Sequence, residues 1–73
     1  MIADLRPSTR EFIADHLQFV ARYTDTAQRF VEMGDDNGLE YSIRKLVEYV
    51  KGVARATGDI LRENEAADHE RAT

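Results

Sequence analysis

Hydrophobic residues in the N-terminal half of the chain recur at alternating steps of four and three. They are Ile13, Leu17, Val20, Thr24, Ala27 and Val31. A second, aromatic stripe lies roughly 100° around a helix from them. Its members are Phe12, Phe19, Tyr23 and Phe30. The pattern predicts an amphipathic helix with two hydrophobic stripes, of which a single neighbouring helix covers only one.

The ends of this first helix are marked by capping signals. Ser8 and Glu11 have the spacing of a capping box, in which each side chain accepts a hydrogen bond from the other residue's backbone N–H. Pro7 opposes an earlier start, and Gly34 suits the left-handed residue that ends a helix. We therefore predict a helix from about Thr9 to Met33.

The C-terminal half shows the same alternation. Its seam is Leu39, Ile43, Leu46, Val50, Val53, Thr57 and Ile60, widened by Val47, Ala54 and Leu61 on one side and by Tyr49 on the other. This predicts a second helix over about 39–64, with Asp36 or Asn37 as its N-cap. Residues 65–73 include no apolar residue larger than alanine, so we expect a frayed polar tail.

The short connection predicts an all-α fold, an antiparallel hairpin of two helices forming one domain over 1–73 with an N-terminal arm over 1–7. The seams are expected to pair Val31 with Ile43, Ala27 near Leu46, and Val20 near Val53. Two glycines interrupt the second helix. Gly58 is expected opposite Ala14, where the helices approach closely, whereas Gly52 projects to the polar face without an evident reason.

The aromatic stripe is the surplus of this arrangement, and it predicts an association face. With two residues from the second helix, the expected face is Phe12, Phe19, Tyr23, Phe30, Tyr49 and Ile60. A homodimer forming a four-helix bundle is the favoured explanation, because a lone hairpin has a small core. A groove-binding face for a different protein and a folded-back N-terminal arm that covers the stripe are the alternatives.

Composition restricts the remaining choices. The 73 residues carry a net charge of −4 and no cysteine, which excludes disulfides and thiolate metal sites. No signal peptide and no membrane-spanning run is recognisable, so we expect a soluble, cytoplasmic protein that does not bind membranes.

Residues for catalysis or cofactor binding are scarce. His16 lies between the two stripes of the first helix and is interpreted as a half-buried structural histidine. Glu65 and His69 share a helix face, but two ligands do not make a metal site. The sequence therefore predicts no enzyme activity, no cofactor and no metal.

Four cations line a narrow strip of the second helix: Arg44, Lys51, Arg55 and Arg62. Such a strip can follow nucleic-acid phosphates, which is the alternative function for this chain. Glu48 and Asp59 flank the strip at spacings that allow pairing within the helix, which favours an ordinary solvated face.

In size and predicted architecture the chain resembles Rop-type plasmid copy-number regulators, which are helical hairpins that dimerise and bind RNA. In size and charge it is similar to small acidic phage proteins such as anti-CRISPR inhibitors and antitoxin-like partners. Neither resemblance carries over a functional residue. They imply a small regulator or inhibitor that binds a protein partner and occludes its surface, with a dimeric RNA- or DNA-binding regulator as the alternative.

Overall fold

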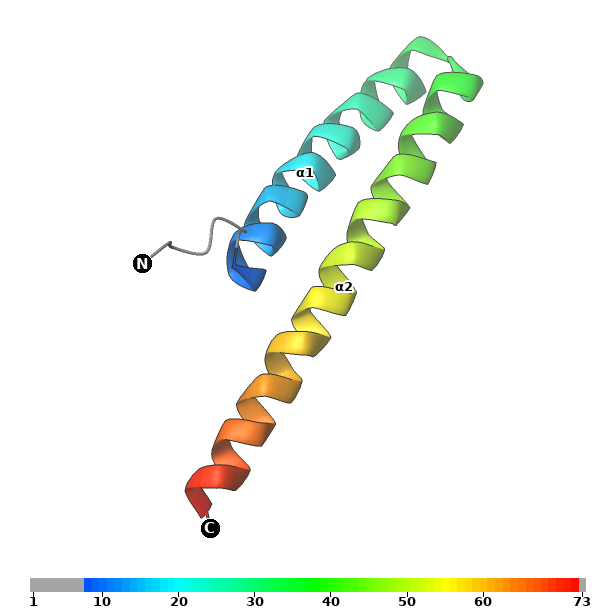
Figure 1. Ribbon diagram of the computed structural model, residues 1–73. Helices are drawn as coiled ribbons and strands as arrows, with labels where there is room; N and C mark the ends of the chain where they lie inside the picture. The colour runs from blue at the N-terminus through cyan, green and yellow to red at the C-terminus, as the bar shows by residue number, and fades with distance from the viewer. Residues whose placement is uncertain (1–7, 73) are drawn as a thin grey trace.

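The structure, a computed structural model, describes residues 8–72 as two antiparallel helices. Helix α1 spans Thr9–Met33 and helix α2 spans Asp36–Ala72 (Figure 1). The predicted helical hairpin is confirmed, and the bounds of α1 are those expected. The predicted arm over 1–7 lies outside the described residues.

Local hydrogen bonds explain where α1 begins and ends. The Ser8 hydroxyl oxygen accepts from the Glu11 N–H at 3.1 Å, as the capping-box spacing predicts. Gly34 is left-handed, with φ 72° and ψ 23°. The Asp35 N–H then donates to the Phe30 carbonyl at 2.9 Å, and the Gly34 N–H to the Val31 carbonyl at 3.2 Å. These two bonds form a Schellman motif, which satisfies the last carbonyls of the helix.

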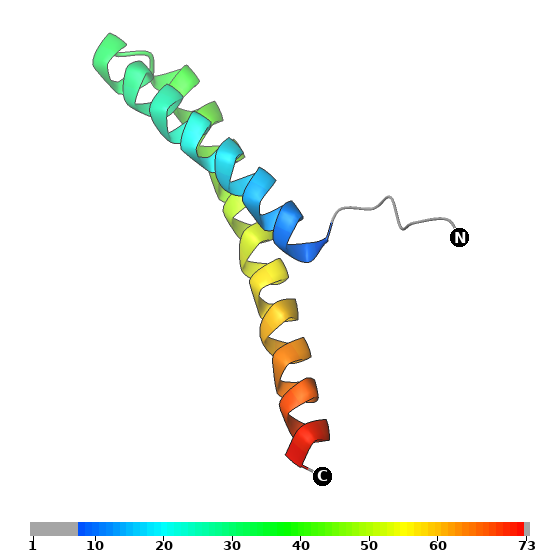
Figure 2. The same ribbon diagram turned by 90° about the vertical axis from the view of Figure 1, so that its left-hand side faces the viewer.

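Helix α2 is longer at both ends than the expected span of about 39–64. Asp35, rather than Asp36 or Asn37, caps α2, since its carboxylate accepts from the Gly38 N–H at 2.9 Å. Only Gly34 and Asp35 therefore separate the helices. At its other end α2 continues to Ala72 instead of stopping near Asn64, because a segment rich in Glu, Ala and Arg has high helix propensity. Figure 2 shows that α2 is curved and extends well past the start of α1.

Contact between the helices follows an inner seam of residues that are all buried or half-buried. On α1 the inner seam is Ile13, His16, Val20, Tyr23, Ala27 and Phe30, and on α2 it is Leu39, Ser42, Leu46, Tyr49, Val53, Ala56 and Ile60. This seam is rotated from the predicted one. Val31 and Ile43, which were expected to meet, are 60% and 44% exposed. Both residues therefore lie outside the inner seam in which they were expected.

Complementary side-chain size accounts for the rotation. A Cβ on Gly38 would lie 2.5 Å from carbons of the Phe30 ring, so the ring packs directly on the glycine backbone. Gly52 likewise faces His16, whose ring carbon is 3.4 Å from the Cβ position. The expectation that Gly52 projects to the polar face was therefore wrong. The predicted approach at Gly58 is also absent within the described chain, where only the Arg62 guanidinium lies within 4 Å of the Cβ position.

Candidate association surfaces

Twelve of the thirteen positions that directly follow an inner-seam residue form a surface that we call the uncharged face; the thirteenth, Glu40, lies in the first turns of α2 and is charged. The members of the uncharged face are Ala14, Leu17, Ala21, Thr24, Gln28 and Val31 of α1, and Ile43, Val47, Val50, Ala54, Thr57 and Leu61 of α2. All twelve are exposed and none carries a charge. Thirteen positions drawn at the 33% charged fraction of the chain would include about four charged residues, whereas the thirteen that follow the inner seam include one, Glu40. The absence of charge is thus concentrated on these positions.

Helix geometry places the two halves of the uncharged face side by side. On each helix, one residue further along the chain means a rotation of about 100° about the helix axis. Viewed from the N-terminus of its own helix, the uncharged face is therefore rotated from the inner seam in the same direction on α1 and on α2. Because the helices are antiparallel, equal turns in the same sense lead to the same side of the hairpin. Six large aliphatic side chains are exposed there: Leu17 49%, Val31 60%, Ile43 44%, Val47 41%, Val50 45% and Leu61 58%.

The two threonines of the uncharged face do not present free hydroxyl groups. The Thr24 hydroxyl donates to the Val20 carbonyl and the Thr57 hydroxyl to the Val53 carbonyl, both at 2.8 Å. A hydroxyl that already has a partner within its own helix can be covered without losing a hydrogen bond. Both residues therefore suit burial against another apolar surface.

The predicted aromatic association face belongs largely to the hairpin itself. The rings of Phe19 and Tyr23 stack on Tyr49 of the other helix, with centroids 5.0 and 5.7 Å away. Phe30 packs on Gly38, and Ile60 is half-buried in the inner seam. Only part of this stripe, Phe12 and Phe19, therefore stays exposed once the hairpin forms. A contact of Phe12 or Phe19 with a second protein stays a prediction, since these side chains are 39% and 37% exposed.

His16 occupies the structural position that the sequence indicates. Its ring stacks on Phe12 at 3.8 Å between centroids and meets the Tyr49 ring edge-on at 5.4 Å. Its Nδ1 lies 3.0 Å from the Phe12 carbonyl oxygen, one turn back in the helix. Within the part of the chain that the structure describes, no group of three or more potential metal ligands surrounds it or any other site.

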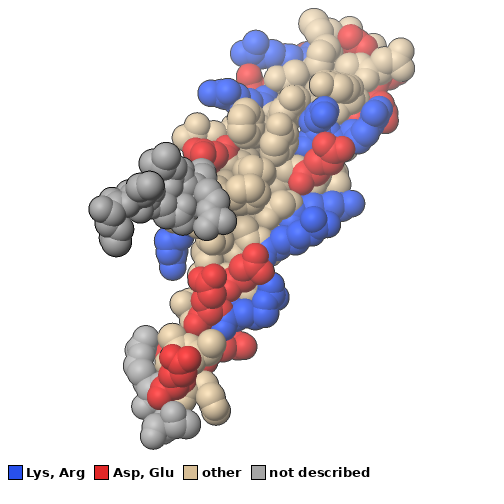
Figure 3. Space-filling view, in the orientation of Figure 1, with Lys and Arg blue, Asp and Glu red and all other residues tan. Residues whose placement is uncertain are grey.

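The basic strip on α2 is interrupted by ion pairs. Arg44 donates to Glu40, and Arg62 to Asp59. The hydrogen bond to Glu40, followed by the Coulomb attraction of that carboxylate, raises the pKa of Arg44 above its usual value. Glu48 lies 3.9 Å from Lys45, rather than pairing with Arg44 or Lys51 as expected. Figure 3 shows positive and negative groups interleaved along the outer edge of α2.

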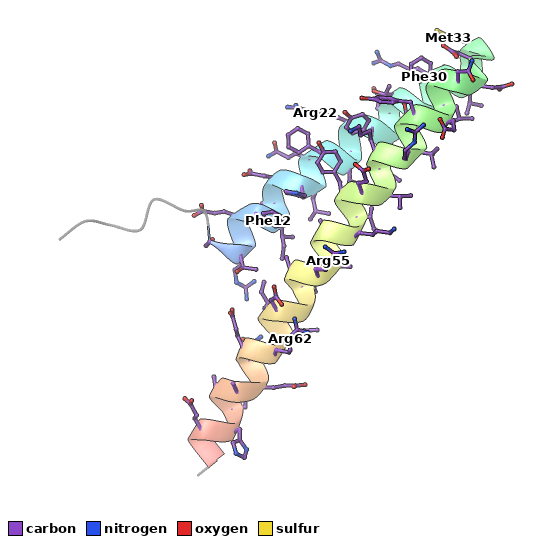
Figure 4. The ribbon with its side chains drawn as sticks, turned by 45° about the vertical axis from the view of Figure 1, so that its right-hand side comes forward. Phe12, Arg22, Phe30, Met33, Arg55 and Arg62 are labelled. Carbon is purple, nitrogen blue, oxygen red and sulfur yellow. The ribbon has the colours of Figure 1, made fainter. Side chains whose placement is uncertain are left out.

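Arg22, which does not belong to the basic strip, does not extend it. Figure 4 shows Arg55 and Arg62 along the C-terminal half of α2, whereas Arg22 projects from α1. The Arg22 guanidinium lies 5.7 Å from the centre of the Phe19 ring. The cations are therefore distributed over both helices rather than gathered into one positive patch.

The sequence did not indicate a shallow groove where α2 passes the first turn of α1. It has a volume of about 370 Å³ and is lined by Ser8, Thr9, Phe12, Gly52, Arg55, Ala56 and Asp59. The groove forms for two reasons. Gly52 and Ala56 have no large side chain to fill the space, and α1 begins directly after Ser8, so no earlier turn of α1 covers it. The groove is open and carries one cation and one carboxylate, so its charge selects neither a cation nor an anion.

Comparisons with known proteins add no relative. No helix in the described residues is long and apolar enough to cross a membrane. No protein-family model, curated protein or solved structure matches the chain.

Proposed function

We propose that the chain is a non-enzymatic protein-binding module that acts through its uncharged face, as a small regulator or inhibitor covering the surface of a protein partner. The observation that carries this proposal is the run of twelve exposed positions without a charge. Contiguous apolar surface of this kind is typical of protein interaction sites. The helical spacing of the six large aliphatic residues suits a partner that presents a helix or a helical groove.

The size of the apolar contribution is consistent with specific binding. Burying a Val, Leu or Ile side chain completely stabilises by about 1.5–3 kcal/mol, so covering a side chain already half in contact contributes about 1 kcal/mol. The six aliphatic residues are between 41% and 60% exposed. Together they offer roughly 6 kcal/mol from this chain alone, before any contribution from the partner.

Charge distinguishes a protein partner from a nucleic acid. The uncharged face contains no Lys or Arg that could neutralise a phosphate. On the basic strip, Arg44 and Arg62 already pair with carboxylates of their own helix. These observations support protein binding over the RNA- or DNA-binding alternative.

A binding assay with matched variants tests the proposal. Val50→Asp places a charge in the uncharged face, and Tyr41→Asp places the same charge elsewhere on α2 at a side chain of similar exposure, 49% against 45%. We expect immobilised wild-type chain and Tyr41→Asp to retain the same protein, whether a host protein or the free chain, and Val50→Asp to lose it. Equal retention by all three chains, or by none, would contradict the proposal.

A further inference from the structure

We infer that the uncharged face binds a second copy of this chain, so that two hairpins pack face to face as a four-helix bundle. The inference rests on the proposed function and names its partner. It also moves the expected dimer contact from the aromatic stripe to the opposite side of the hairpin.

The first argument is the incomplete core of the single hairpin. The only buried residues within the described chain are Ala27, Ala56 and Ser42, and all three are small. Small domains are marginally stable even with larger cores, and they commonly rely on disulfides, metals or oligomerisation. The chain contains no cysteine, and its described residues hold no cluster of metal ligands. Association with a second hairpin would enlarge this core.

The second argument is the angle between the inner seam and the uncharged face. Each helix of a four-helix bundle lies between two neighbours, which contact it at directions about a right angle apart. On both α1 and α2 each residue of the uncharged face follows an inner-seam residue by one position, and the face therefore lies about 100° from the seam. Each helix thus has one seam for its partner in the hairpin and one seam for a helix of another molecule.

The third argument is self-complementarity. The uncharged face covers positions 14–31 on α1 and 43–61 on α2, so both helices offer it over nearly equal lengths. A basic or acidic partner would find no opposite charge on this surface, whereas a second copy presents the same aliphatic side chains and the same internally bonded threonines. An isologous dimer requires such a surface, because the same patch must serve on both sides of the contact.

The mass of the purified full chain in solution tests this inference. In sedimentation equilibrium we expect wild-type chain and Tyr41→Asp to have twice the 8.3 kDa mass of one chain. Val50→Asp should raise the dissociation constant of the dimer by at least about tenfold, because it places a charge in an apolar contact. If Val50→Asp loses its helical circular dichroism, Val50→Thr replaces it, because this variant keeps the shape of the side chain and should weaken the dimer to a smaller, measurable extent.

Two results would overturn the inference: a monomeric wild-type chain, or a dimer that does not depend on Val50. A folded wild-type monomer at concentrations up to about 100 µM would exclude a second copy as the partner. In that case the proposed function still stands if the binding assay detects a host protein that Val50→Asp loses, and it falls if nothing binds. A dimer that Phe19→Asp dissociates while Val50→Asp leaves it intact would place the interface on the aromatic stripe.

Discussion

The glycines of α2 provide a direct test of the way the two helices pack. In a helix interior, replacing glycine by alanine stabilises by about 1 kcal/mol if the new methyl group meets no other atom. At Gly58 the methyl group would lie 3.4 Å from the Arg62 guanidinium, which is the movable end of an exposed side chain. We therefore expect Gly58→Ala to raise the free energy of unfolding by about 1 kcal/mol.

The same substitution at Gly38 should have the opposite sign. Its methyl group would lie 2.5 Å from two carbons of the Phe30 ring and 2.9 Å from a third, so the ring must leave its position. Overpacking of this kind typically costs about 1–3 kcal/mol, which exceeds the gain in helix propensity. The net expectation for Gly38→Ala is a loss of roughly 1–2 kcal/mol.

Thermal unfolding followed by circular dichroism measures both variants. In a chain of this size, 1 kcal/mol shifts Tm by about 4–8 °C. All samples need the same protein concentration, because the Tm of a self-associating protein depends on it. An increase in Tm for Gly38→Ala as large as that for Gly58→Ala would show that Phe30 does not pack on Gly38, and it would refute the observed inner seam.

Three further predictions address the cap, the buried hydroxyl and the basic strip. Asp35→Ala should lower the stability by about 1 kcal/mol in thermal unfolding, because it removes the acceptor for the Gly38 N–H, whereas Asp36→Ala should cost less; equal losses would refute the assignment of the cap. Ser42→Ala should raise Tm, because the fully buried Ser42 hydroxyl has no hydrogen-bond partner within the described chain; a lower Tm would reveal such a partner. Charge reversal of Lys51 and Arg55 to Glu should leave protein binding unchanged in the immobilised-chain assay, and a loss of salt-dependent RNA binding in the variant would instead support the nucleic-acid alternative.

The sequence predicted the helices well because their ends depend on local chemistry. Ser8 and Gly34 act within one turn of the helix ends: the Ser8 hydroxyl accepts from the Glu11 N–H, and Gly34 takes the left-handed conformation that ends α1. The tail over 65–72 was harder to judge. Residues 65–70 bury little, yet they favour the helix by intrinsic propensity.

The orientation of the helices about their own axes could not be predicted from hydrophobicity. The inner seam and the uncharged face have the same alternation of three and four, and they differ by one residue. Leu17, Val31, Ile43 and Val50 are the more hydrophobic choice, and they were expected inside. The structure instead places the large rings of His16 and Phe30 against glycines of α2, a match that depends on the size of residues far apart in the sequence.

The most direct test of the account is a measurement of which methyl groups contact the second copy. Isotope-filtered nuclear Overhauser spectra of a mixture of labelled and unlabelled chains detect only contacts between molecules. We predict intermolecular contacts to the methyl groups of Leu17, Val47 and Val50, and none to the Ala27 methyl group, which is buried within the hairpin. Intermolecular contacts confined to the Phe12 and Phe19 rings, or a folded protein with no such contacts, would contradict the account.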